Sequence, residues 1–207
     1  MVTIAFLPAY IPVDVCGTVG QDPATASVDQ CMAKVLDQVR AGGVSAPPAL
    51  VGPDGKPVDA KQASAAEAQL KDLRQIVTDA KGHGLDLKIV VLPTNPWTDP
   101  PMRDIATVVG DANPGSTVLA LSPAHVGSYS TTVSRVKLEA GEDLARTGNP
   151  VLSAKNFVGQ IETPIFPWTE FTIVLVLGVI LAAVGTRVLQ VRARKAGVTK
   201  AAEPAAQ

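Results

Sequence analysis

Five polar residues gather in one stretch of the chain where a metal ion could be held. The group consists of Asn95, Asp99, Arg103, Asp104 and Asp111. It follows an apolar run typical of a buried strand, and ligands of open α/β sheets bind at the carboxyl ends of such strands. Carboxylate oxygens suit calcium, so Asp99, Asp104 and Asp111 are the predicted metal ligands and calcium is the candidate cofactor. The alternative is structural: Asp99 caps a helix, Asp104 lies in its first turn, and Asp111 lies in a turn.

A histidine among serines is the second group with chemical potential. His125 lies in the stretch SPAHVGSYS, which also contains Ser122, Ser128 and Ser130. This combination occurs in nucleophilic catalysis, where the histidine activates a serine hydroxyl. The sequence has no GxSxG turn, however, and no acid lies close by in the sequence to orient the imidazole ring. We therefore predict no catalytic residues and favour a non-enzymatic protein.

The segment GEDLARTGNP, residues 141–150, has the composition of a surface loop with a helical turn. Glu142, Asp143 and Arg146 are predicted to form a local salt bridge in water, or else the edge of a binding surface. Loops held by a rigid scaffold are where binding residues concentrate, so this segment is a second candidate for function.

The two cysteines, Cys16 and Cys31, are fifteen positions apart. This spacing fits no zinc site, because such a site needs four closely placed ligands. In an oxidising compartment the two residues can form a disulfide, and elsewhere they are ordinary small apolar side chains. The sequence leaves both interpretations open.

The periodicity of apolar residues predicts an α/β domain over residues 1–163, built as a small mixed-sheet sandwich. The expected strands are residues 2–7, 85–93, 116–123 and 134–139, the last an outer strand with one wet face. The expected helices are residues 28–40, 64–81, 100–109 and 150–162. A loop rich in proline and glycine occupies residues 44–61.

An apolar segment near the C-terminus predicts a membrane anchor. Residues 171–186 contain no charged side chain, and the apolar stretch continues to residue 191 if Arg187 extends its guanidinium to the surface. Such a helix reaches about 31 Å, which is the thickness of a bilayer core. A core helix of a soluble protein would show a polar stripe, which is absent here. We expect a linker at 164–170, a transmembrane helix at 171–191 and a basic tail at 192–207.

The distribution of basic residues predicts how the chain is oriented. Residues 151–170 contain one base, Lys155, whereas five follow the apolar run, and basic residues stay on the cytoplasmic side. We therefore expect the N-terminal domain outside and the tail inside. The N-terminus opposes this, because MVTIAFLPAYIPVD has no basic region and is not a recognisable signal peptide. The net charge of -1 argues against a nucleic-acid partner, and the lipid bilayer is the expected one.

Residues 70–167 resemble a TPM domain. The resemblance is carried by the order of LKIVVLPT, DIATVVGDA, STVLALSP, SRVKLEAGEDL, SAKNFVGQI and TPIFPW. It implies an extracytoplasmic domain beside a single anchoring helix, and it brings calcium binding or phosphatase activity into consideration. The loop LSPAHVGSYS is neutral, whereas TPM domains usually carry a charged loop at this place.

The whole chain is also similar to small actinobacterial single-pass membrane proteins encoded beside NlpC-type peptidoglycan endopeptidases. The matching stretches are LPAYIPVD, DLKIVVL, RDIATVVGD, LEAGEDLARTGNPV and FPWTEFTIVLVLGV. This resemblance implies a cell-envelope setting and supplies no activity. The predicted anchor, the outward domain and the missing catalytic constellation favour a non-enzymatic envelope protein that binds or regulates a partner such as a cell-wall hydrolase. Two alternatives stay open: a calcium- or metal-dependent phosphatase of the TPM kind, and an accessory subunit of a membrane complex that packs through Gly178 and Gly185.

Overall fold

The computed structural model describes residues 10–48, 59–164 and 168–201, with side chains as far as residue 194. The strand expected at residues 2–7 lies outside these ranges. The chain divides into two units, Met1–Thr163 and Pro164–Gln207. Each unit is described by itself below.

The first unit is organised around a mixed four-stranded sheet, which confirms the predicted fold class. Its strands are β1 (Val44–Ser45), β2 (Leu87–Val91), β3 (Thr117–Leu121) and β4 (Val126–Ser130). They lie in the order β1-β2-β3-β4. The pairs β1–β2 and β2–β3 are parallel, whereas β4 returns antiparallel to β3. The carboxyl ends of β2 and β3 therefore lie at one edge of the sheet.

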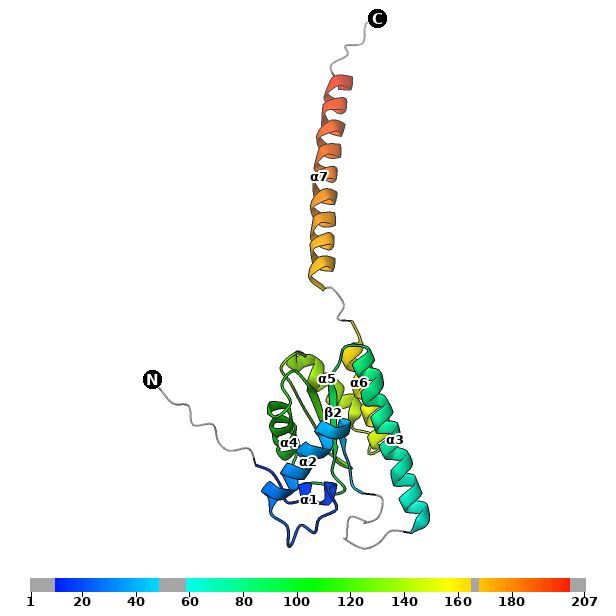
Figure 1. Cartoon of the computed structure of the whole chain (residues 1–207). Helices are drawn as coiled ribbons and strands as arrows, with labels where there is room; N and C mark the ends of the chain where they lie inside the picture. The colour runs from blue at the N-terminus through cyan, green and yellow to red at the C-terminus, as the bar shows by residue number, and fades with distance from the viewer. Residues whose placement is uncertain (1–9, 49–58, 165–167, 202–207) are drawn as a thin grey trace, which may run out of the picture. The chain divides into compact units, whose positions relative to one another are not determined.

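In the part of this unit that the structure describes, six helices surround the sheet (Figure 1). They are α1 (Val15–Thr18), α2 (Val28–Gly42), α3 (Ala60–Gly82), α4 (Pro100–Asp111), α5 (Arg135–Ala145) and α6 (Pro150–Glu162). Local sequence signals fix several of their ends. The side chain of Asp59 accepts a hydrogen bond from the backbone of Gln62, and Asn149 caps α6 in the same way. Gly43 ends α2 with a φ of 73°, a left-handed conformation that glycine adopts at no steric cost.

Two apolar cores fill the space between the helices and the sheet. Alternate residues of β2 point to opposite faces, so Ile89 belongs to one core and Val90 to the other. Helices α3, α5 and α6 cover the first face, and α1, α2 and α4 cover the second. The domain is thus a three-layer sandwich in which both faces of the sheet are buried, as is typical of parallel strands.

A disulfide joins Cys16 in α1 to Cys31 in α2. Both cysteines are fully buried in the second core, and their Cα atoms are 4.9 Å apart. The bridge fastens the irregular N-terminal segment to the helical layer. Of the two interpretations that the sequence leaves open, the structure therefore has the disulfide.

The prediction of an outer strand at residues 134–139 is wrong, because these residues begin α5. Val136 and Leu138 alternate with polar residues as in a strand, but the buried positions continue at helical spacing: Leu138, Gly141, Glu142 and Ala145. Glu142 conceals this period because a charged residue occupies a buried position. The expected loop at 141–150 shrinks accordingly to the four residues between α5 and α6. Strands β1 and β4 were not predicted.

The second unit contains one long helix, α7 (Trp168–Ala201). Residues 168–194 are long and apolar enough to cross a membrane, and none of that stretch is buried. The helix begins three residues before the predicted span and continues beyond it, so Trp168–Glu170 and much of the basic tail are helical. The rings of Trp168 and Phe171 pack edge to face, with centroids 6.4 Å apart, at the start of the apolar stretch. Aromatic side chains are enriched where membrane-spanning helices meet the membrane–water interface.

Candidate binding site at the carboxyl end of the sheet

Three connections meet at the carboxyl ends of β2 and β3. They are the β2–α4 loop, the β3–β4 turn and the α5–α6 loop. Asn95 links the first two: its Oδ1 accepts hydrogen bonds from the backbone N–H of Ala124 at 2.7 Å and from the hydroxyl of Ser122 at 3.0 Å. The hydroxyl of Thr94 donates to Asp14 at 2.8 Å, which ties the same loop to the start of α1. Side-chain hydrogen bonds therefore join the β2–α4 loop to the β3–β4 turn and to the start of α1.

Asp99 is the centre of a polar cluster at this edge. Its Oδ1 lies 2.6 Å from Nδ1 of His125, and its Oδ2 lies 3.3 Å from the guanidinium of Arg146. Asp99 stands at the N-cap position of α4, but its side chain makes no capping hydrogen bond there. The predicted capping role is thus wrong. The acid that orients the imidazole of His125 is Asp99, which no pattern close in sequence could reveal.

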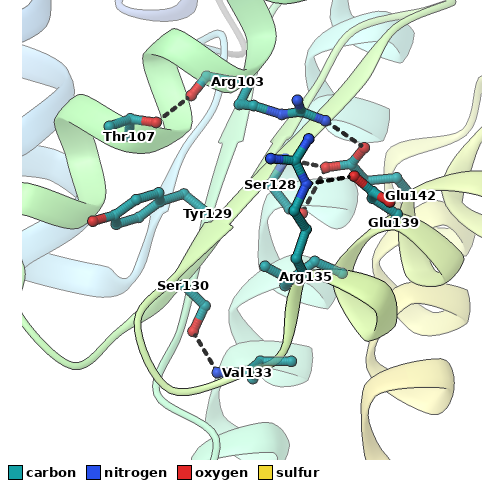
Figure 2. A pocket seen from close by; sticks show the side chains of 10 residues that line it. Arg103, Thr107, Ser128, Tyr129, Ser130, Val133, Arg135, Glu139 and Glu142 are labelled. Carbon is teal, nitrogen blue, oxygen red and sulfur yellow. Dashed lines mark hydrogen bonds and ion pairs between the residues drawn. The ribbon is translucent and has the colours of Figure 1, made fainter. Parts of the chain in front are cut away.

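Glu142, a residue of α5, is the second central residue of the site. Its carboxylate packs against the unpaired edge of β4. Its side chain is only 8% exposed. One carboxylate oxygen accepts hydrogen bonds from both the backbone N–H and the hydroxyl of Ser128, each at 2.7 Å, and the other lies 3.8 Å from Arg103 (Figure 2). The carboxylate thereby covers an edge-strand donor that would otherwise need another partner. The prediction of a local salt bridge among Glu142, Asp143 and Arg146 is therefore wrong for two of them: Glu142 pairs with Arg103, and Arg146 pairs with Asp99.

A cavity of about 160 Å³ lies between α4, β4 and α5, and Figure 2 shows its lining. Arg135 and Glu139 pair across one turn of α5 at 2.7 Å. This hydrogen bond lowers the pKa of Glu139 below its ordinary value and raises the pKa of Arg135. A neighbouring cavity of about 210 Å³ shares Arg103 and Glu142 and extends to Asp99. Both cavities are lined by acids as well as bases, so the charges largely compensate one another.

The three predicted metal ligands take separate partners. Asp99 holds His125 and Arg146, Asp104 accepts the backbone N–H of Tyr10 at 2.9 Å, and Asp111 accepts the hydroxyl of Tyr129 at 3.0 Å. In the part of the chain that the structure describes, no group of three or more His, Cys, Asp or Glu residues could hold a metal ion. The described residues thus do not bring together the several oxygen ligands that calcium needs. The calcium site stays a prediction.

The serines near His125 also take other partners. The hydroxyl of Ser122 bonds Asn95 and the backbone of His125, that of Ser128 bonds Glu142, and that of Ser130 bonds Thr117 and Thr132. A catalytic serine needs a hydrogen bond to the imidazole, which these pairings do not supply. The Asp99–His125 pair therefore orients a ring at the surface without activating a serine.

The hydrogen bond between Tyr129 and Asp111 makes stability depend on pH. This bond, followed by burial and the charge of Asp111, raises the pKa of Tyr129 above its ordinary value of 10.0. A raised pKa in the folded state contributes stability that is complete below the unfolded pKa and is lost as pH rises through the folded one. We expect urea unfolding between about pH 9 and pH 11 to show a steeper loss of stability in the natural chain than in Asp111→Asn. Tyr129→Phe should match Asp111→Asn; equal slopes in all three chains would contradict the coupling.

The fold and the long apolar helix together define a class of protein: an α/β domain that contains a disulfide, followed by one candidate membrane span within the described residues. The chain belongs to the family described as Membrane protein Rv1476, whose model matches residues 10–203. It is 47% identical over 204 residues to "Membrane protein Rv1476" of Mycobacterium tuberculosis (strain ATCC 25618 / H37Rv). The alignment covers 99% of this chain and 91% of that relative. No solved structure matches. The chain is therefore a membrane protein, as predicted.

Proposed function

We propose that this protein is a non-enzymatic component of the cell envelope that displays its domain outside the membrane and binds a partner there, such as a cell-wall hydrolase. The observation that carries the proposal is the buried disulfide between Cys16 and Cys31. Disulfides persist in oxidising compartments and are rare in the cytosol. The bridge therefore supports the same orientation as the charge distribution, and the two arguments are independent.

A binding role accords better with the site than a catalytic one. The polar groups at the carboxyl edge of the sheet pair with one another: Asp99 with His125 and Arg146, and Glu142 with Arg103 and Ser128. Such mutual pairing orients side chains before a ligand arrives and so reduces the cost of binding. A catalytic site would instead need a nucleophile or general base aimed at an open position.

Reporter fusions test the orientation. Alkaline phosphatase, which is active only outside, is fused before residue 1, and a green fluorescent protein, which matures in the cytoplasm, is fused after residue 207. We expect both reporters to be active, because the domain lies outside and the basic end of α7 lies inside. Exchanging the two reporters is the matched control and should silence both. Activity only in the exchanged pair would contradict the proposal.

Thiol labelling of the unfused chain gives a second readout. A maleimide reagent should modify Cys16 and Cys31 only after denaturation and reduction, since both are bridged and buried. Labelling after denaturation without reduction would mean that the thiols are free, which would remove the observation on which the orientation rests.

A further inference from the structure

Trp97 stands almost entirely in water at the carboxyl edge of the sheet. The residue is 97% exposed, and it lies in the loop between β2 and α4. Tryptophan is highly buried on average, because its large indole gains much from leaving water. An indole that the domain leaves uncovered is thus a strong candidate for a contact with something outside the chain.

The loop on either side of Trp97 is held in place. Two residues before it, Asn95 is fixed by hydrogen bonds from Ser122 and Ala124, and Pro96 is buried. Two residues after it, Asp99 pairs with His125 and Arg146. The backbone that carries the indole is therefore pinned at both sides, which lowers the conformational entropy that a ligand would have to overcome.

The residues that flank Trp97 in the chain are mostly polar and exposed. Asn95, Thr98 and Asp99 are all exposed. Both hydrogen bonds recorded for Asn95 within the described chain use Oδ1, which leaves the N–H donors of Nδ2 for another acceptor. Asp99 supplies acceptor oxygens, and a cavity of about 210 Å³ begins beside it. An exposed indole between polar, exposed chain neighbours differs from an anchor for a protein partner, whose tryptophan enters an apolar, dehydrated contact.

We propose that Trp97 stacks on a pyranose ring of an envelope glycan, with Asn95 and Asp99 hydrogen-bonded to its substituents. One face of a pyranose presents C–H groups with slight positive charge, which complement the negative face of the indole. The rim of the same ring carries hydroxyl or acetamido groups, which need donors and acceptors of the kind that Asn95 and Asp99 provide. This inference rests on the proposed outward orientation, because only there does the domain meet such glycans.

Binding is tested with the full chain in detergent micelles. Purified peptidoglycan sacculi are sedimented with the natural chain, and chitotetraose, a β-linked N-acetylglucosamine tetramer without peptide, is added as a competitor. We expect sedimentation that chitotetraose reverses. Trp97→Ala should weaken binding at least about tenfold, while Trp97→Phe should retain part of it. Neither change should unfold the domain, since the side chain is exposed.

Val136→Ala is the matched control, because Val136 is a 78% exposed apolar residue at the opposite end of α5 from Arg146. It should bind as the natural chain does. Absence of binding by the natural chain, equal binding by Trp97→Ala, or failure of chitotetraose to compete would each overturn the glycan inference. The reporter fusions test the orientation separately, so a failure here leaves the proposed function standing.

Fluorescence separates a glycan from a protein ligand. In a Trp168→Phe chain Trp97 is the only tryptophan. Sacculi and chitotetraose should each reduce quenching of its emission by acrylamide. Shielding by a soluble envelope protein, without shielding by either glycan, would show that the surface binds protein and would overturn the inference.

Discussion

Replacing Glu142 by alanine is expected to lower the free energy of unfolding of the domain by about 3 kcal/mol. The change leaves the N–H and the hydroxyl of Ser128 without their acceptor, and Ser128 is only 5% exposed. It also leaves Arg103 without its ion-pair partner. Unpaired buried donors carry the full cost of desolvation, which is why the loss exceeds that of an ordinary hydrogen bond. Urea unfolding of the full chain in detergent, followed by circular dichroism, measures this difference.

Two variants separate this effect from a simple change of charge. Glu139→Ala removes a carboxylate one turn away whose side chain is 49% exposed, and it should change stability by less than about 1 kcal/mol. Glu142→Gln keeps an oxygen that can accept from Ser128 and should recover part of the loss. If Glu142→Ala and Glu139→Ala lowered the free energy of unfolding equally, Glu142 would act as a surface charge and not as the acceptor for Ser128 at the edge of β4.

Gly127→Ala is expected to destabilise the domain by about 3 kcal/mol, for a steric reason. Gly127 lies in the middle of β4, directly under α4. A Cβ atom added there would lie 2.5 Å from the backbone nitrogen of Arg103 and 2.5 Å from the carbonyl carbon of Met102. Backbone atoms of a helix cannot move aside as a flexible side chain can, so α4 would have to shift away from the sheet.

The shift of α4 should also be visible at the candidate site, because α4 carries Arg103 toward Glu142. We expect faster hydrogen exchange at the backbone N–H of Ser128 in Gly127→Ala. Gly159→Ala is the matched control: this glycine lies inside α6, is exposed, and has open space around its Cα. Alanine there should stabilise by about 0.5–1 kcal/mol, since it favours the helix. A neutral Gly127→Ala would disprove the close approach of β4 and α4.

The elements that the sequence predicted are those with an unbroken pattern. Helices α2, α4 and α6 repeat apolar residues at helical spacing, and β2 and β3 each contain a continuous apolar run. The pattern failed at α5 and β4. In α5 a buried position holds Glu142, whose partner Ser128 lies in another element. In β4 the sequence VGSYS is weakly apolar because the strand lies at the sheet edge and needs Gly127 beneath α4.

The region of the candidate site was predicted, but its contacts were not. Strand ends mark where ligands gather in an α/β sheet, so Asn95, Asp99 and Arg103 were expected at this edge. Their partners could not be read from spacing. Asp99 and Arg146 are 47 positions apart, and Asn95 reaches Ala124 across 29 positions. Trp97 escaped notice because its residue type alone predicts burial, whereas the structure leaves it exposed.

The sequence by itself determined the candidate membrane span, the charge asymmetry around it and the α/β class. These properties depend on the hydrophobicity of each side chain and on the spacing of apolar residues over short stretches. Both can be read from residues that are close together in sequence. Only the tertiary structure decided that Cys16 bonds Cys31, that Asp99 orients His125, and that Glu142 is buried beneath Arg103. Such pairings depend on which segments, distant in sequence, are brought together by the folded sheet. A charged side chain can be buried only where another part of the fold supplies its hydrogen-bond or ion-pair partner.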